Sequence, residues 1–144
     1  MSDQLPLVSR SLPIALLRAR ERVMGPIRKL LIDAGVTEQQ WRVLRLLKEE
    51  GASEPTDISE RACLLLPSLT RILQKLEDKG LIKRRCHPKD RRRQIVEITA
   101  KGEQIIQDNL TGIVQQADRM RAHLGPEKHE TLLDILNELK NFKE

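Results

Sequence analysis

Residues 81–99 interrupt a chain that is otherwise patterned for α-helices. On both sides of this segment, apolar residues recur at steps of three and four, the spacing of one face of a helix. Within the segment, "LIKRRC" and "RQIVEIT" are typical of two short strands, and the alternation of Val96 and Ile98 with their neighbours predicts one partly buried face. The chain is therefore expected to be mainly α, with one small β-hairpin.

The predicted hairpin also carries the positive charge of the chain. From Lys83 to Arg93 there are seven basic residues and one acid, Asp90, which gives +6 in a chain whose total is +5, so the other residues sum to −1. We expect the two strands to be joined by a turn around Pro88–Arg92, at the centre of this charge. A charge so concentrated favours nucleic acid or an anionic membrane surface as a partner.

Composition narrows the choice of partner. Aromatic residues make up 1% of the chain, so the stacking platforms that bind single-stranded nucleic acid are not expected. No apolar run approaches the ~20 residues of a membrane span, and the N-terminus lacks the pattern of a signal peptide. Two cysteines do not make a secreted disulfide framework. A cytoplasmic location without a membrane partner is expected.

The sequence contains no recognisable catalytic or metal-binding motif. We find no Gly-rich phosphate loop, no nucleophile elbow and no clustered carboxylate–histidine set, so the chain is not expected to be an enzyme. Cys86-His87, His123 and His129 do not have the spacing of zinc ligands. Neither a metal nor a cofactor is expected.

Six helices are predicted: one, then a group of three, then the hairpin, then two more. The first ends at Ala34-Gly35 after a kink at Gly25-Pro26. Thr37 and Gln40 form a capping box that opens the second. A short third helix begins at Pro55, the fourth covers residues 67–79, and Gly125-Pro126 separates the last two.

Three short helices followed by a hairpin are the layout of a winged helix-turn-helix, in which one helix enters the major groove of DNA and the hairpin, or wing, lies beside it. The helix at 67–79 fits the recognition role. Its polar face is predicted to consist of Ser68, Thr70, Arg71, Gln74 and Lys75. Arg71 could contact a guanine, Gln74 an adenine and Lys75 a phosphate. An ordinary helix with a solvated face is the alternative, but the basic hairpin directly after it favours DNA.

These residues also resemble a known family. The stretch "PSLTRILQKLEDKGLIKRRCHPKDRRRQIVEITAKG" is similar to the recognition helix and wing of the MarR family of bacterial regulators, with the wing pattern at Asp90, Arg92, Ile98, Thr99 and Gly102. The resemblance extends over nearly the whole chain. Three further segments, "IALLRARERVM", "TEQQWRVLRLL" and "RACLLLPSLTRIL", resemble the subgroup that represses operons for homoprotocatechuate (4-hydroxyphenylacetate) breakdown.

The resemblance implies a homodimer that binds a pseudo-palindromic operator in double-stranded DNA and is released by an aromatic acid. It places Ser68, Thr70 and Arg71 at contact positions of the recognition helix. It makes Arg92 the arginine that enters the minor groove and Asp90 the acid that holds the wing arginines. This wing is richer in arginine than the family average, so Arg91 and Arg93 are candidates for the inserted residue as well.

The apolar stripes of the terminal helices also predict a homodimer. They are wider than a small winged lobe can cover, so a partner copy is the simplest place to bury them. An intramolecular bundle is the alternative. We expect one domain over 1–144, with a winged lobe at 37–99 and a helical dimerisation region at 9–34 and 100–144.

An acidic effector needs a cation in its binding cleft. Arg18, Arg20, Arg22 and Arg42 are candidates. Arg20 is preferred because it matches the subgroup and lies beside a stripe, at Ala19 and Val23, that we expect to be buried. A solvated surface arginine is the alternative. Trp41 could line the same cleft or belong to the core.

Two other functions stay open. A redox-responsive regulator of this family would use a cysteine. Cys63 adjoins the apolar run "LLL" and is expected to be packed and inert, whereas Cys86, among Arg84, Arg85 and His87, is the more reactive thiol. A winged-helix scaffold that binds protein or an anionic surface through its basic hairpin is the other alternative.

Overall fold

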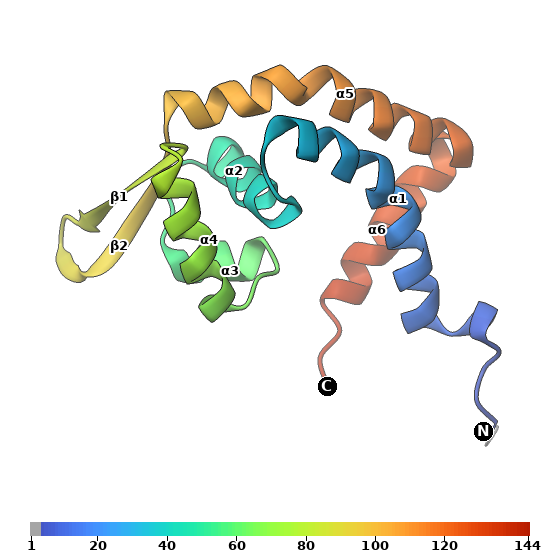
Figure 1. The fold of residues 1–144 in the computed structure, drawn as a ribbon. Coiled ribbons are helices and arrows are strands. Elements are labelled where there is room, and N and C mark those ends of the chain that lie inside the picture. The colour runs from blue at the N-terminus through green and yellow to red at the C-terminus, as the bar shows by residue number, and fades with distance from the viewer. Residues whose placement is uncertain (1–3) are drawn as a thin grey trace. The chain divides into compact units, whose positions relative to one another are not determined.

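The computed structural model describes residues 4–144 and contains the predicted order of helices and hairpin. After a single 3-10 turn, η1 (Val8–Arg10), the elements are α1 (Leu12–Ala34), α2 (Glu38–Glu50), α3 (Pro55–Arg61), α4 (Leu66–Asp78), β1 (Ile82–His87), β2 (Asp90–Ile98), α5 (Ala100–Leu124) and α6 (Pro126–Lys140) (Figure 1). The expected class, mainly α with one small hairpin, is confirmed. α1 is one continuous helix across Gly25-Pro26, with Pro26 inside it.

The chain divides into two compact units, each described here by itself. The first, which we call the central lobe, is Arg28–Leu110. It contains the end of α1, all of α2, α3, α4 and the hairpin, and the start of α5. The second, which we call the terminal helices, consists of the chain up to Ile27 together with Thr111–Glu144.

The central lobe has an aliphatic core that joins its three short helices to the hairpin. α2 opens with the predicted capping box: the Thr37 hydroxyl accepts from the Gln40 amide, and the Gln40 side chain accepts from the Thr37 amide, both at 3.1 Å. Burial of one face of each helix then fixes the lobe. The buried side chains include Trp41, Val43, Leu44 and Leu47 of α2, Ile58 of α3, Leu69, Leu73 and Leu76 of α4, and Ile82 and Val96 of the hairpin.

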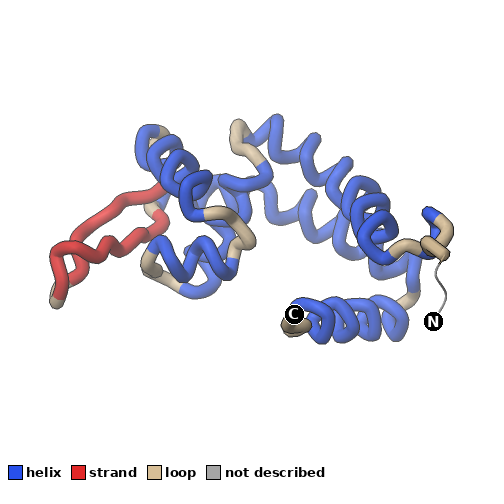
Figure 2. Tube along the Cα trace, turned by 90° about the horizontal axis from the view of Figure 1, so that it is seen from below, coloured by secondary structure: helices blue, strands red, loops and turns tan. Residues whose placement is uncertain are grey.

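The hairpin, which we call the wing, is tighter at its tip than the sequence predicted (Figure 2). Its register runs from Ile82–Ile98 to Cys86–Gln94 and then steps directly to His87–Asp90. The turn lies at the start of the predicted Pro88–Arg92 but is shorter, because Pro88 and Lys89 alone close the hairpin and β2 begins at Asp90. Proline suits the first corner of such a turn, and the Lys89 amide donates to the His87 ring at 3.0 Å.

This register leaves residues 91–93 without a partner across the hairpin. Cys86 and His87 of β1 therefore oppose residues 90–94 of β2, an irregularity of the bulge type that redirects the side chains within it, and we call residues 91–93 the bulge. All three consecutive arginines of the wing lie in it. Sequence alternation alone could not reveal this interruption.

The base of the wing is attached to the rest of the central lobe by backbone contacts. The Ser53 amide donates to the Val96 carbonyl at 3.0 Å, and the Val96 amide donates to the Ser53 carbonyl at 2.8 Å. The Thr99 hydroxyl then accepts from the Gly102 amide at 3.2 Å as α5 begins. A Cβ at Gly102 would overlap the Leu81 carbonyl oxygen and the Ile98 side chain, so only glycine allows α5 to start this close to the wing.

The terminal helices bury none of their described side chains. α6 has no buried residue, and the only buried residues of α1 and α5 are Leu31 and Gly102, which belong to the central lobe. Ala19 and Val23, in the stripe expected to be buried against a partner copy, are exposed in the single chain. The exposed apolar side chains include Leu12, Leu16, Leu17, Leu132, Leu133, Ile135, Leu136, Leu139 and Phe142. No helix in the described part of the chain is long and apolar enough to cross a membrane.

Candidate nucleic-acid interface

The polar face of α4 is open to solvent. Leu69, Leu73 and Leu76 hold the opposite face in the core. Of the predicted contact residues, Ser68 is half-buried, and the exposed ones are Thr70, Arg71, Gln74 and Lys75. Leu65, which precedes the helix, is 77% exposed, and Leu66 is exposed as well. The start of α4 therefore presents an apolar tip beside its polar face, which the sequence analysis did not anticipate.

The predicted base-contacting side chains of α4 differ in their availability. Within residues 4–144, Arg71 and Lys75 have no ion-pair partner. The Thr70 hydroxyl donates to the Leu66 carbonyl at 3.1 Å. Gln74 is engaged at both ends: its Nε2 donates to Asp78 at 2.9 Å, and its Oε1 accepts from Arg84 Nη2 at 2.8 Å. In the free protein Gln74 therefore connects α4 to the wing.

Arg84 attaches β1 to α4 rather than adding free charge to the wing. Its Nη2 donates to Glu77 Oε1 at 2.9 Å and its Nε to Glu77 Oε2 at 3.2 Å. This hydrogen-bonded pair lowers the pKa of the Glu77 carboxyl and raises the pKa of Arg84. Glu77 and Arg84 are seven residues apart in the sequence. Their opposite charges and this spacing could not show whether Arg84 pairs with Glu77 or contacts DNA.

Two further cations at the base of the wing are paired with one acid on the opposite strand. Arg85 Nε donates to Glu97 Oε1 at 2.6 Å, and Lys83 Nζ lies 3.6 Å from Glu97 Oε2. The hydrogen bond from Arg85 lowers the pKa of Glu97. The +6 of the sequence count is therefore not presented evenly along the hairpin, because its base is largely neutralised.

The arginines of the bulge have different surroundings. Arg93 Nε donates to Glu54 Oε1 at 2.5 Å and its Nη2 to Glu54 Oε2 at 2.7 Å, so both bonds of a planar pair are formed. Arg92 is 93% exposed; its amide donates to Asp90 Oδ1 at 3.0 Å, and its Nε lies 3.4 Å from the same oxygen. Across the described residues, neither Arg91 nor Lys89 has an ion-pair partner. The exposed charge is thus at the tip, on Lys89 and Arg91, unpaired in the described structure, and on Arg92, which stays exposed beside Asp90.

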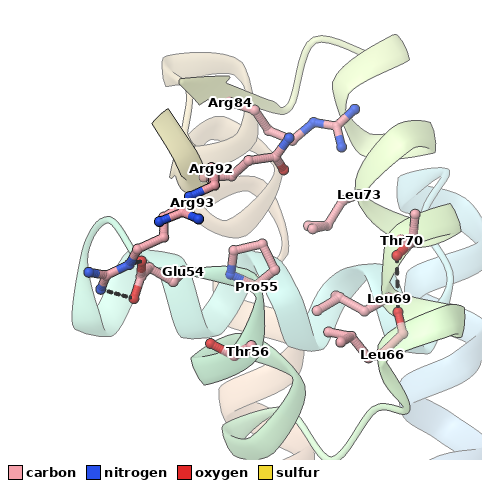
Figure 3. Close-up of a pocket in the computed structure, with 11 residues that line it drawn as sticks. Glu54, Pro55, Thr56, Leu66, Leu69, Thr70, Leu73, Arg84, Arg92 and Arg93 are labelled. Carbon is pink, nitrogen blue, oxygen red and sulfur yellow. Dashed lines mark hydrogen bonds and ion pairs between the residues drawn. The ribbon is translucent and has the colours of Figure 1, made fainter. Parts of the chain in front are cut away.

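An open pocket of about 490 Å³ lies between the wing and the helices (Figure 3). Thr70 lines it from α4, Pro55 from α3, and Arg84, Arg92 and Arg93 from the wing. Figure 3 shows Arg93 extending from β2 toward Glu54, with both hydrogen bonds of the pair drawn. One concave surface therefore combines the side of α4 with the arginines of the wing.

The residues predicted to bind an effector have different environments. Arg20 is exposed on α1. Trp41 is 6% exposed and belongs to the core of the central lobe. Arg42 holds the turn after α3, because its Nη1 donates to the Ala62 carbonyl at 2.7 Å and to the Cys63 carbonyl at 3.4 Å. The Nε of Arg42 is buried without a hydrogen-bond partner in the described structure.

The prediction of a packed Cys63 was wrong. Cys63 lies in the turn between α3 and α4, has a left-handed backbone with a φ of 55°, and is exposed. Cys86 is exposed too, and neither cysteine is in a disulfide. Among the residues that the structure describes, no three His, Cys, Asp or Glu side chains are grouped as metal ligands.

Three helices with a buried inner face, an exposed polar face on the third and a wing tipped with exposed cations define a winged helix-turn-helix protein. Comparison with known proteins identifies the particular kind. The sequence model of a family described as the MarR family matches residues 36–93.

The curated relatives match over most of their length. The chain is 38% identical to the HTH-type transcriptional regulator FarR of Neisseria gonorrhoeae, with 93% of this chain and 92% of that protein covered. It is 37% identical to the homoprotocatechuate degradative operon repressor of Escherichia coli, with 89% and 86% covered. A crystal structure of NadR in complex with 4-hydroxyphenylacetate is 38% identical, with 99% and 100% covered and a TM-score of 0.86. The chain belongs to the MarR family of transcriptional regulators.

Proposed function

We propose that this chain is a homodimeric repressor that binds a pseudo-palindromic operator in double-stranded DNA. We further propose that it controls an aromatic-acid catabolic operon and is released by a small aromatic carboxylate. The observation that carries the proposal is the position of the exposed positive charge. Lys89, Arg91 and Arg92 lie at the tip of a wing that adjoins the exposed face of α4.

In this proposal, residues 37–99 form the DNA-binding lobe and α4 enters the major groove. Arg71 and Ser68 contact base edges, and Lys75 contacts a phosphate. Gln74 reaches a base only after its bonds to Asp78 and Arg84 exchange. Arg91, Arg92 or Arg93 enters the adjacent minor groove, where the narrow and negative groove favours arginine.

The dimer is proposed from burial. The stretches 9–34 and 100–144 carry most of the large apolar side chains that the described chain leaves exposed, and an identical partner offers an identical apolar surface. Two copies would also place two recognition helices about 34 Å apart, in successive major grooves on one side of the duplex.

The effector is proposed from the relatives. One is named as a repressor of the homoprotocatechuate degradative operon, and another was crystallised with 4-hydroxyphenylacetate. A carboxylate of this kind needs a cation, for which Arg20 is the preferred candidate. Arg42 is a separate candidate, because its Nε is buried without a hydrogen-bond partner in the described structure. Trp41, beside it in sequence, is the proposed apolar neighbour.

Selection from a random duplex library tests the DNA-binding proposal. We expect the chain to enrich one pseudo-palindrome and to bind it with a steep negative slope of log affinity against log salt concentration. Equal affinity for every duplex and for anionic vesicles would contradict the proposal and favour a winged-helix scaffold.

The effector proposal has its own test on the selected duplex. We expect 4-hydroxyphenylacetate to release the wild-type protein, and 4-hydroxyphenylethanol, which lacks the carboxylate, to release it poorly. The Arg20→Ala variant should bind the duplex normally and fail to respond. A full response in this variant would refute the role of Arg20.

A further inference from the structure

The wing is connected to the helices on both of its strands. On β1, Arg84 is paired with Glu77 of α4. On β2, Val96 is bridged to Ser53, and Arg93 forms its two-bonded pair with Glu54. Val96 lies opposite Arg84 in the register, whereas Arg93 is three residues nearer the tip. Among the described residues, Glu54–Arg93 is therefore the outermost ion pair between the wing and the helices.

The Glu54–Arg93 pair lies where the wing has little other support. A two-stranded hairpin is marginal by itself, and here its ladder is interrupted at residues 91–93. An exposed ion pair usually contributes little to folding. A two-bonded arginine–carboxylate pair nevertheless fixes the relative orientation of its partners. The pair holds the chain at the one place where the ladder does not.

The Glu54 carboxylate is not used to cap α3, so it is available to bind Arg93. Glu54 is the residue before α3, where a short polar side chain would ordinarily cap the helix, but its carboxylate makes no cap hydrogen bond. The hydrogen bond from Arg93 lowers the pKa of Glu54, so the carboxylate is ionised at neutral pH. Both donors that face it come from one guanidinium.

We propose that Glu54 is a positioning residue for DNA binding, which holds Arg93 and thereby sets the angle at which the wing presents Arg91 and Arg92. Arg93 then serves as the anchor of the wing and is not itself a phosphate or minor-groove contact. The inference rests on the proposed function. It also narrows the three wing arginines to two that are available for DNA.

A charge exchange distinguishes an anchor from a DNA contact. On the duplex selected by the wild-type protein, Glu54→Gln should weaken binding about three- to tenfold, although the protein becomes more positive. The salt slope should stay unchanged, because no phosphate contact is lost. The exchanged pair, Glu54→Arg with Arg93→Glu, has the wild-type net charge and should return affinity to within about threefold of the wild type.

Glu97→Gln is the matched control. It removes an acid that is also bound to an arginine of the wing but that does not reach the helices. We expect unchanged or tighter binding, since Arg85 and Lys83 are released. Urea unfolding of each variant verifies that the central lobe is folded before binding is compared.

Three results would overturn the inference while leaving the proposed function intact. The first is a salt slope that is about one unit flatter in Arg93→Gln, because that change marks a lost phosphate contact. The second is tighter DNA binding by Glu54→Gln. The third is failure of the exchanged pair to recover the affinity of the wild type. If the wild-type protein itself shows no preference among duplexes, the proposed function fails, and the inference fails with it.

Discussion

The central lobe and the terminal helices carry the same kind of pattern and use it differently. Both have apolar residues at helical spacing, but Leu44, Leu69 and Leu76 of the central lobe are fully buried, whereas Leu132 and Leu136 of α6 are exposed. The lobe supplies its own cover through α2, α3, α4 and the wing. Periodicity thus predicts which face of a helix is apolar, and the tertiary structure determines what covers that face.

The largest effect is expected from a substitution in the core of the central lobe. Leu44→Ala should lower the free energy of unfolding by about 2–5 kcal/mol, because it leaves a cavity in a closely packed core. Urea unfolding monitored by Trp41 fluorescence measures the free energy of unfolding of both proteins. The difference between wild type and variant should be the same at all protein concentrations. A loss below 1 kcal/mol would mean that this core is not the one that stabilises the lobe.

A change in the terminal helices should act on association instead. Leu136→Glu places a charge on the exposed apolar face of α6. If that face is buried against a second copy, the dimer dissociation constant should rise about a hundredfold, or about 2.7 kcal/mol. Sedimentation equilibrium measures this constant, with Glu138→Ala on the same helix as the control. Unchanged association in Leu136→Glu would remove α6 from the interface.

Within the central lobe, Arg71→Ala separates base reading from charge. Arg71 is exposed on α4 and makes no ion pair in the part of the chain described. We expect the variant to lose about 1–3 kcal/mol of discrimination at one base pair per half-site. Competition among single-base variants of the selected duplex measures this loss. An equal fall in affinity for every sequence would make Arg71 a phosphate contact.

The smallest expected effect concerns the acid at the tip of the wing. Asp90 accepts from the amide of Arg92 and lies beside its guanidinium. Asp90→Ala raises the net charge, but it also frees an arginine that then loses more rotamer freedom when it binds. We expect specific affinity to fall a few-fold in a titration of the selected duplex. Tighter specific binding would show that the carboxylate only repels DNA.

Much of the fold was accessible from local sequence. The capping box at Thr37 and Gln40, the end of α4 before Gly80 and the buried face at Val96 all depend on residues a few positions apart. The polar face of α4 followed from the same periodicity. These features need no knowledge of distant segments, so one sequence is enough to predict them.

The details of the wing were not accessible in this way. Glu54 and Arg93 are 39 residues apart, and nothing in the local pattern connects them. The bulge at residues 91–93 depends on which residues pair across the hairpin, so a turn was predicted where the strand continues. The exposure of Cys63 follows from a left-handed backbone in a short turn. Each of these features is set by tertiary geometry.

The salt dependence of binding to the selected duplex tests the central claim most directly. Fluorescence anisotropy over a range of salt concentrations should give a steep negative slope for the wild-type protein and a slope about one unit flatter for Arg92→Ala. Lys128→Ala, which removes the same charge from α6, should keep the wild-type slope. Equal affinity for unrelated duplexes, or one slope for all three proteins, would contradict DNA binding through the wing.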